Sequence, residues 1–149
     1  MILIPRPMPN PADTLLLRVV TPAGAVIEEP AASVALWTAL GQIEVLRGHE
    51  PTVVLLEPGE LRIYSPPGPD RVFAAGEGFA RVDQKTVTVF TDMAEDAARI
   101  NLNDAEDAKH RAESALAEAE KLSEDERHAA DLALRESLVR IQLTLRRKV

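Results

Sequence analysis

The distribution of glycine and proline constrains this chain more than any other feature. All 7 glycines and all 11 prolines lie before residue 100, and residues 100–149 contain neither. These residues shape turns and interrupt helices, so their abundance divides a chain into short segments and their absence permits long helices. The chain therefore has a turn-rich first part and a helix-forming second part, with the change near residue 98.

The first part consists of short apolar segments separated by turn residues. In several of them apolar and polar positions alternate, as at Leu61 and Ile63, which is the period of strands with one buried face. The segments are LLLRVVT, AVIEE, SVALWT, QIEVL, TVVLL, ELRIYS, DRVFAA, GFARV and TVTVFT. Strands spaced by about 8–12 residues are typical of an all-β sandwich or barrel. We predict such a domain over residues 15–98, with about nine or ten strands, after a proline-rich tail over residues 1–14.

The second part carries two helix-start signals. Asn103 is followed three residues later by Glu106, and Ser123 is followed three residues later by Glu126. In such capping boxes each side chain satisfies a free backbone N–H at a helix start, so helices should begin near residues 104 and 124. We predict an antiparallel hairpin of two α-helices over residues 99–149, which makes the whole chain an α+β protein.

The apolar stripes of the two helices differ in size. The first has small residues at steps of three and four: Ala105, Ala108, Ala112, Ala115, Ala119 and Leu122. The second has larger ones: Ala130, Leu134, Leu138, Ile141 and Leu145. Leu132, Val139 and Leu143 fall outside this second stripe and need another cover, either the β domain or a partner. Because alanine buries little apolar area, the hairpin alone should be marginal, as expected of either a mobile or a docked appendage.

Composition excludes several classes of function. A formal charge of −7 argues against a nucleic-acid-binding protein. The absence of cysteine and the presence of only 3 histidines argue against disulfides, thiolate chemistry and a structural zinc site. No apolar run approaches the roughly 20 residues that span a bilayer, and the prolines of the amino end are unlike a signal peptide. Any membrane association should therefore go through partners.

The basic end of the hairpin is a candidate contact with an acidic partner. The basic residues of this end are Arg135, Arg140, Arg146, Arg147 and Lys148. Cations near a helix C-terminus complement the helix dipole, which accounts for the last three of these residues but not for the first two.

No motif makes a case for catalysis. The GEG sequence over Gly76–Gly78 fits a strand-joining turn better than a phosphate loop. Asp92 and Glu95 are readable as paired carboxylates, but a polar linker is expected where they lie. His49, in the turn RGHEP, is readable as a base, a metal ligand or a shaped corner. It has no second histidine or nucleophile in the β part, which favours the corner. The helical histidines, His110 and His128, are expected at the surface.

Local sequence now adds a resemblance to a known family. GQIEVLRGHEPTVVLLEPGELRI resembles the GxxGxxPGHxPxxxxLxPGxLRI signature of the ε subunit of bacterial F-type ATP synthases, the δ subunit of mitochondria. LRVVTPAGAVIEEPAASV and FAAGEGFARVDQKTVTVFTDMAE are similar to the first strands and the last strands of the same sandwich. The resemblance covers nearly the whole chain from Leu15.

The resemblance implies a non-catalytic rotor subunit. Its β domain would contact the γ subunit and the c-ring and help to couple ion flow to ATP synthesis or hydrolysis. The helical hairpin would lie beside the sandwich or extend among the α and β subunits and inhibit hydrolysis. The candidate subunit-interface residues are Gln42, Glu44, Arg47, His49 and Glu50. The basic residues of the hairpin would meet an acidic loop of the catalytic β subunits.

Three departures from the family pattern alter these expectations. Arg47 replaces the first proline of the PGHxP turn, and Glu44 and Gln42 replace a glycine and an acid, respectively, before it. Nucleotide-sensing members carry I/L-D-x-x-R-A, whereas here Asn101 replaces the acid and Asp104 the arginine. A carboxylate in place of a phosphate-facing cation opposes polyanion binding, so we expect no cofactor and weak or absent ATP binding.

Other functions stay open at this stage. The alternatives are an ATP-sensing nucleotide-binding module and a β-sandwich adaptor unrelated to ATPases. A rotor subunit would lie on the cytoplasmic side of the inner membrane, peripheral to it. The proline-rich tail and the altered turn are features expected of a divergent, alternate ATPase, whose coupling ion is H⁺ or Na⁺.

Overall fold

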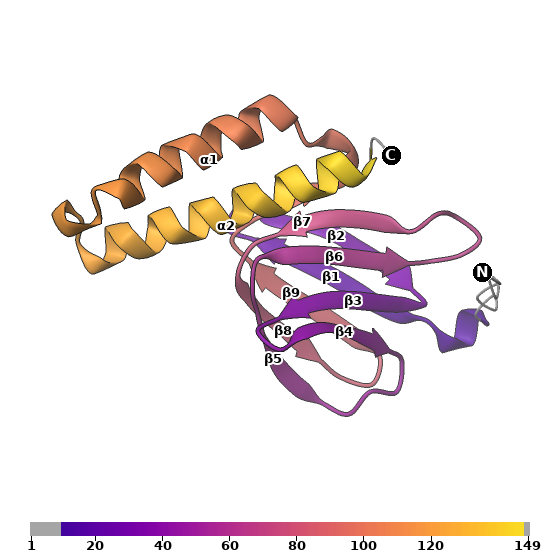
Figure 1. Cartoon of the computed structure of the whole chain (residues 1–149). Helices are drawn as coiled ribbons and strands as arrows, with labels where there is room; N and C mark the ends of the chain where they lie inside the picture. The colour runs from indigo at the N-terminus through magenta and orange to yellow at the C-terminus, as the bar shows by residue number, and fades with distance from the viewer. Residues whose placement is uncertain (1–9, 148–149) are drawn as a thin grey trace.

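The computed structural model describes residues 10–147 and contains a sandwich of β-strands followed by two helices (Figure 1). The strands are β1 (Leu15–Thr21), β2 (Gly24–Ala31), β3 (Ser33–Thr38), β4 (Gly41–Leu46), β5 (Thr52–Leu56), β6 (Gly59–Tyr64), β7 (Arg71–Ala75), β8 (Gly78–Val82), β9 (Thr86–Thr91) and β10 (Ala94–Asp96). The helices are the 3-10 turns η1 (Pro11–Asp13), η2 (Ala97–Arg99) and η3 (Ala119–Lys121) and the α-helices α1 (Leu102–Ala117) and α2 (Glu124–Arg147). The predicted α+β class, a sandwich followed by a helical hairpin, is confirmed.

The strands form one 10-stranded sheet that folds over on itself. Its order is β10-β7-β6-β3-β5-β8-β9-β1-β2, with β4 paired to β3 outside this path. Strands β6, β7 and β3 lie in one layer, and β1, β2 and β9 lie behind them in Figure 1. Most neighbours are antiparallel, whereas β1 and β9 run parallel. The parallel pair joins the first strand of the sandwich to a strand about 70 residues later in the sequence.

The core between the layers is aliphatic and follows the alternation seen in the sequence. Along β1, Leu15, Leu17 and Val19 are buried while Arg18 between them is exposed. The predicted inward residues of β6, Leu61 and Ile63, are also buried. A strand turns successive side chains to opposite faces, so this pattern places one face of each strand in the core.

One of the two predicted helix starts is wrong and the other is confirmed. Helix α1 begins at Leu102, and its cap is Asn101, whose side chain accepts a hydrogen bond from the Asp104 N–H at 3.1 Å. Asn103 lies inside the helix, because an asparagine two residues earlier already satisfies the free N–H. At α2 the capping box forms as predicted: the Glu126 N–H donates to Ser123 Oγ at 3.1 Å.

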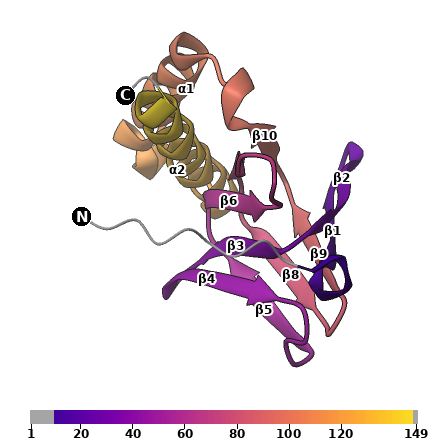
Figure 2. The same ribbon diagram turned by 90° about the vertical axis from the view of Figure 1, so that its right-hand side faces the viewer.

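Helix α2 lies between α1 and the sandwich and crosses β6 and β7 (Figures 1 and 2). Leu143 is buried in a small cluster with Ala74 and Ile100, and Val139 packs against this cluster. The β domain therefore supplies the cover that Val139 and Leu143 were predicted to need.

The apolar stripe predicted for α2 is partly wrong. Leu138 and Leu145 are exposed, since the helix turns the row of Val139 and Leu143 toward the sandwich. No helix within residues 10–147 is long and apolar enough to cross a membrane.

Candidate subunit interfaces

The RGHEP turn joins β4 to β5 and is an exposed corner. Gly48 has a positive φ of 89°, and its N–H donates to the Gln84 carbonyl at 2.8 Å, which ties the turn to the β8–β9 connection. The His49 side chain is exposed and does not pack against the sandwich core. Its Nδ1 lies 2.8 Å from the Glu50 carbonyl oxygen. The geometry fits a shaped, solvent-facing corner.

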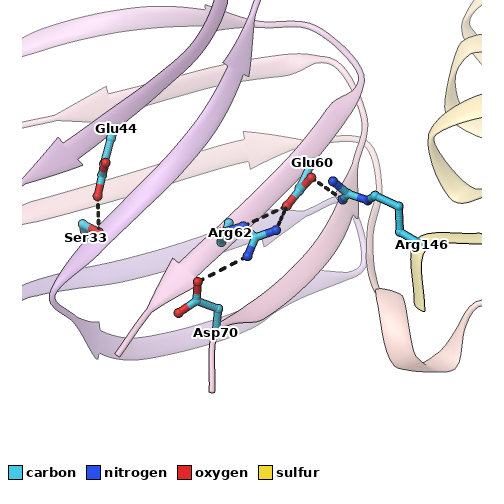
Figure 3. Close-up of polar contacts among 6 residues, drawn as sticks. All are labelled: Ser33, Glu44, Glu60, Arg62, Asp70 and Arg146. Carbon is cyan, nitrogen blue, oxygen red and sulfur yellow. Dashed lines mark hydrogen bonds and ion pairs between the residues drawn. The ribbon is translucent and has the colours of Figure 1, made fainter. Parts of the chain in front are cut away.

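The other predicted interface residues separate into two places. Gln42 and Glu44 lie on β4 and line a groove of about 490 Å³ between β4, β3 and β6. The Ser33 hydroxyl donates to Glu44 there at 2.7 Å (Figure 3). Arg47 lies in the exposed turn and donates to the Ala12 carbonyl of η1. The residue that replaces the family's proline therefore also anchors the segment before β1.

A row of exposed apolar side chains crosses β5, β8 and β9, and sequence reasoning missed it. It consists of Val53 (64% exposed), Leu55 (77%), Phe79 (42%) and Phe90 (37%). Leu55 is paired with Phe79 and Phe79 with Phe90, and the two rings stack with centroids 4.9 Å apart. The signal was present in the segment TVVLL, which is apolar on both faces and so unlike a strand with a solvated face. We call these four residues the apolar strip.

The basic residues of the hairpin bind the sandwich in this structure. Arg140 Nε donates to Glu95 at 2.8 Å, Arg135 pairs with Glu57, and Arg146 pairs with Glu60. Arg147 donates to the carbonyls of Ala97 and Ile100. Lys148 lies outside the described residues. Their predicted contact with an acidic loop of a partner stays a prediction.

Glu60 is the centre of the largest of these ion-pair networks. Arg62, two residues further along β6, binds Glu60 at 2.7 Å and also binds Asp70 at 3.3 Å (Figure 3). Partial burial would raise the pKa of Glu60, but hydrogen bonds from Arg146 and Arg62 outweigh it and hold this pKa below its usual value. One carboxylate thereby joins the end of α2 to the sandwich.

Comparison with known proteins assigns the family. Residues 14–97 match the family model described as "ATP synthase, Delta/Epsilon chain, beta-sandwich domain". The chain is 34% identical over 139 residues to the ATP synthase epsilon chain of Latilactobacillus sakei, covering 91% of this chain and 96% of that one. It is 38% identical over 130 residues to that of Desulfitobacterium hafniense, covering 87% and 96%. This chain belongs to the ATP synthase epsilon-chain family.

Two solved assemblies contain a chain of the same fold. One is the Euglena gracilis mitochondrial ATP synthase, OSCP/F1/c-ring, with a TM-score of 0.70, 24% identity and coverage of 90% of this chain and 81% of that one. The other is the central stalk and c-ring of the Tetrahymena thermophila enzyme, with a TM-score of 0.53, 13% identity and coverage of 91% and 96%. The sandwich with its helical pair is thus a fold that this family shares with distant mitochondrial chains.

The departures from the family's nucleotide motif meet in one small pocket. A cavity of about 250 Å³ is lined by Glu95, Arg99, Asn101, Asp104, Ala105 and Arg140. Asn101 uses its side-chain oxygen to cap α1, and Arg140 is bound to Glu95. Two carboxylates offset the two guanidinium groups, so the pocket has little net positive charge with which to hold a polyphosphate.

Proposed function

We propose that this chain is a central-stalk subunit of an F-type ATP synthase, without catalytic residues of its own. The observation that carries the proposal is similarity to ATP synthase epsilon chains over 96% of their length, in a chain that folds as sandwich plus helical hairpin. Its role is to dock on the γ subunit and help couple ion flow through the c-ring to ATP synthesis or hydrolysis.

The apolar strip is the surface that we assign to γ. A contiguous row of exposed apolar side chains on a stable sheet is typical of a protein interface, and aromatic and aliphatic anchors carry most of the affinity of such contacts. The RGHEP turn lies beside the start of β5, so Arg47, His49 and Glu50 extend this surface with polar groups for γ or the c-ring.

A binding measurement with purified γ tests this assignment. Leu55→Arg places a charge in the centre of the strip and should weaken γ binding by about tenfold or more. Leu40→Arg is the matched control, because Leu40 is fully exposed in the β3–β4 turn, outside the strip. Absence of γ binding by the parent chain overturns the rotor function. Equal binding by the parent and Leu55→Arg overturns only the assignment of the strip.

The hairpin is the regulatory part of the proposed function. Arg135, Arg140 and Arg146 are bound to sandwich carboxylates in the docked arrangement, so extension toward the α and β subunits requires those pairs to break. Removing residues from Ile100 onward should raise ATP hydrolysis by the assembled complex if the hairpin inhibits it. Unchanged hydrolysis would show that the hairpin is not an inhibitor.

ATP sensing is the alternative function that the pocket at α1 opposes. We propose that the isolated chain binds ATP weakly or not at all, because Asp104 faces the pocket where the family's motif has an arginine. Calorimetric titration with ATP should give no saturation in the micromolar range. Micromolar affinity would contradict this, and Asp104→Arg is the variant expected to gain affinity.

The location follows from the proposed assembly. The chain would be held peripherally on the cytoplasmic side of the inner membrane by γ and the c-ring. The coupling ion, H⁺ or Na⁺, would pass through the membrane part of the complex and not through this chain.

A further inference from the structure

Two carboxyl groups from distant parts of the chain meet where the hairpin contacts the sandwich. Asp92 lies in the β9–β10 turn and Glu136 on α2, and both contact Gly76 in the β7–β8 turn. A Cβ at Gly76 would overlap Asp92 Oδ1 and lie 2.7 Å from Glu136 Oε1. Glu136 Oε1 is buried and has no hydrogen-bond partner among residues 10–147. The GEG turn therefore makes room for two acids at this contact.

The charges around Glu136 do not neutralise this pair. Glu77, on the same turn as Gly76, adds a third carboxylate and binds His128 of α2 at 3.2 Å. Arg140, one turn along α2, is the facing cation, but it is already bound to Glu95 of β10. From α1, Asp104 lines a pocket together with Arg140 and Glu95. Acidic groups therefore outnumber basic ones around this contact as a whole.

Two carboxylates cannot share such a site without losing stability, whereas a carboxylic acid and a carboxylate can share one hydrogen bond. Burial first, and then the nearby Asp92 carboxyl group, raise the pKa of Glu136 from 4.5 to about 8. With the hairpin away from the sandwich, Glu136 would be a solvated helix residue with an ordinary pKa. The docked state therefore holds a proton that the undocked state releases at neutral pH.

We propose that the Asp92–Glu136 pair couples docking of the hairpin to uptake of one proton, so that docking weakens progressively as the pH rises through neutrality. Glu136 is protonated in the docked state. Its contribution to the free energy of docking is therefore complete below 4.5, the ordinary pKa of the undocked side chain, and is lost as the pH rises toward about 8. Between these values, the docking equilibrium constant falls by up to about tenfold per pH unit. This proposal concerns the chain alone and does not rest on the proposed function.

The test uses a cysteine introduced under the hairpin of the full chain, which has none of its own. Ala74 is fully buried in the cluster that contains Leu143, so a thiol at this position reacts with a soluble reagent only when α2 lifts away. Labelling rates of Ala74→Cys and of Ala74→Cys with Glu136→Gln are compared from pH 6 to 8.5. Their ratio cancels the pH dependence of the thiol itself.

We expect labelling of Ala74→Cys, relative to the Glu136→Gln chain, to rise by about tenfold or more from pH 6 to 8. The control Glu106→Gln, at an exposed position on α1, should leave the pH dependence unchanged. His128→Asn should also keep it, which separates the role of Glu136 from that of the α2 histidine that contacts Glu77. A ratio that stays constant with pH overturns the proposal.

A second variant covers the case in which glutamine at position 136 prevents docking. Asp92→Asn gives Glu136 an amide donor in place of a carboxylate, which lowers the pKa of Glu136 and should reduce the pH dependence of labelling, although burial, the largest cause of the raised pKa, remains. A full pH dependence in Asp92→Asn overturns the proposal. Failure of this labelling test leaves γ binding untouched, and failure of γ binding leaves the labelling result intact.

Discussion

The sandwich and the docked hairpin are held by different kinds of contact. Between the layers, 17 buried apolar residues form one continuous cluster, whereas the cluster between hairpin and sandwich contains 3 among the described residues. The hairpin adds ion pairs whose arginines are 40–50% exposed, and exposed pairs contribute at most about 1 kcal/mol each. We therefore expect docking and folding to be separable, so that the hairpin can leave a sandwich that stays folded.

The largest expected effect comes from the sandwich core. Ile63→Ala removes a fully buried side chain and should lower the free energy of unfolding by about 2–5 kcal/mol. Urea denaturation followed by circular dichroism measures it. Leu40→Ala, at an exposed turn residue, should cost almost nothing. Equal losses in the two variants would contradict the core assignment.

A smaller and more local effect is expected at the hairpin contact. Leu143→Ala should raise thiol labelling at Ala74→Cys by more than about tenfold, because it removes the buried leucine through which α2 contacts the sandwich. The urea midpoint of the sandwich should stay within error of the parent value. A parallel loss of sandwich stability would show that the two regions fold as one unit.

Acid should weaken docking by a second route. The pKa of Glu60 is lowered by its arginines, so its contribution is present above the ordinary value of 4.5 and is lost as the pH falls through the lowered value. Glu136 acts in the opposite sense as the pH rises from 4.5 toward about 8. Thiol labelling, corrected for the ionisation of the thiol itself, should therefore be slowest near pH 4.5. Arg146→Gln should reduce the increase on the acid side and leave the increase at higher pH unchanged.

The smallest effect is expected for a single ion pair. Arg135→Gln removes the partner of Glu57, a pair with both side chains more than a third exposed. It should raise labelling by less than about fivefold, which corresponds to roughly 1 kcal/mol, and 0.5 M salt should reduce the difference. A larger increase would show that ion pairs, and not the Leu143 cluster, hold the hairpin.

The strands and the fold were predictable because they depend on local pattern. All of the predicted strand segments form strands, since alternation and turn residues act over a few positions. The start of α1 was misplaced because Asn101 and Asn103 are equally good caps by residue type, and only the backbone shows which one is used. The stripe of α2 was misplaced because the helix is apolar on adjacent faces, and a helical pattern does not say which face meets the sandwich.

The candidate sites were less predictable. The apolar strip needs the pairing of β5, β8 and β9, which brings Leu55, Phe79 and Phe90 together from separate segments. The Asp92–Glu136 pair needs the position of α2 on the sheet, and no local signal distinguishes either acid from its solvated neighbours. The basic residues of the hairpin were found from charge patterning, but their partners in the sandwich were not.

Because it binds these arginines, the sandwich competes with any acidic partner for the hairpin of the same chain. Each guanidinium group held by Glu57, Glu60 or Glu95 is unavailable to any other acidic surface. Since the competitor is tethered to the same chain, it acts at an effective concentration of about the millimolar range. An acidic partner that draws the hairpin away must therefore exceed this local concentration, so the hairpin responds only to partners that the assembled complex holds close by.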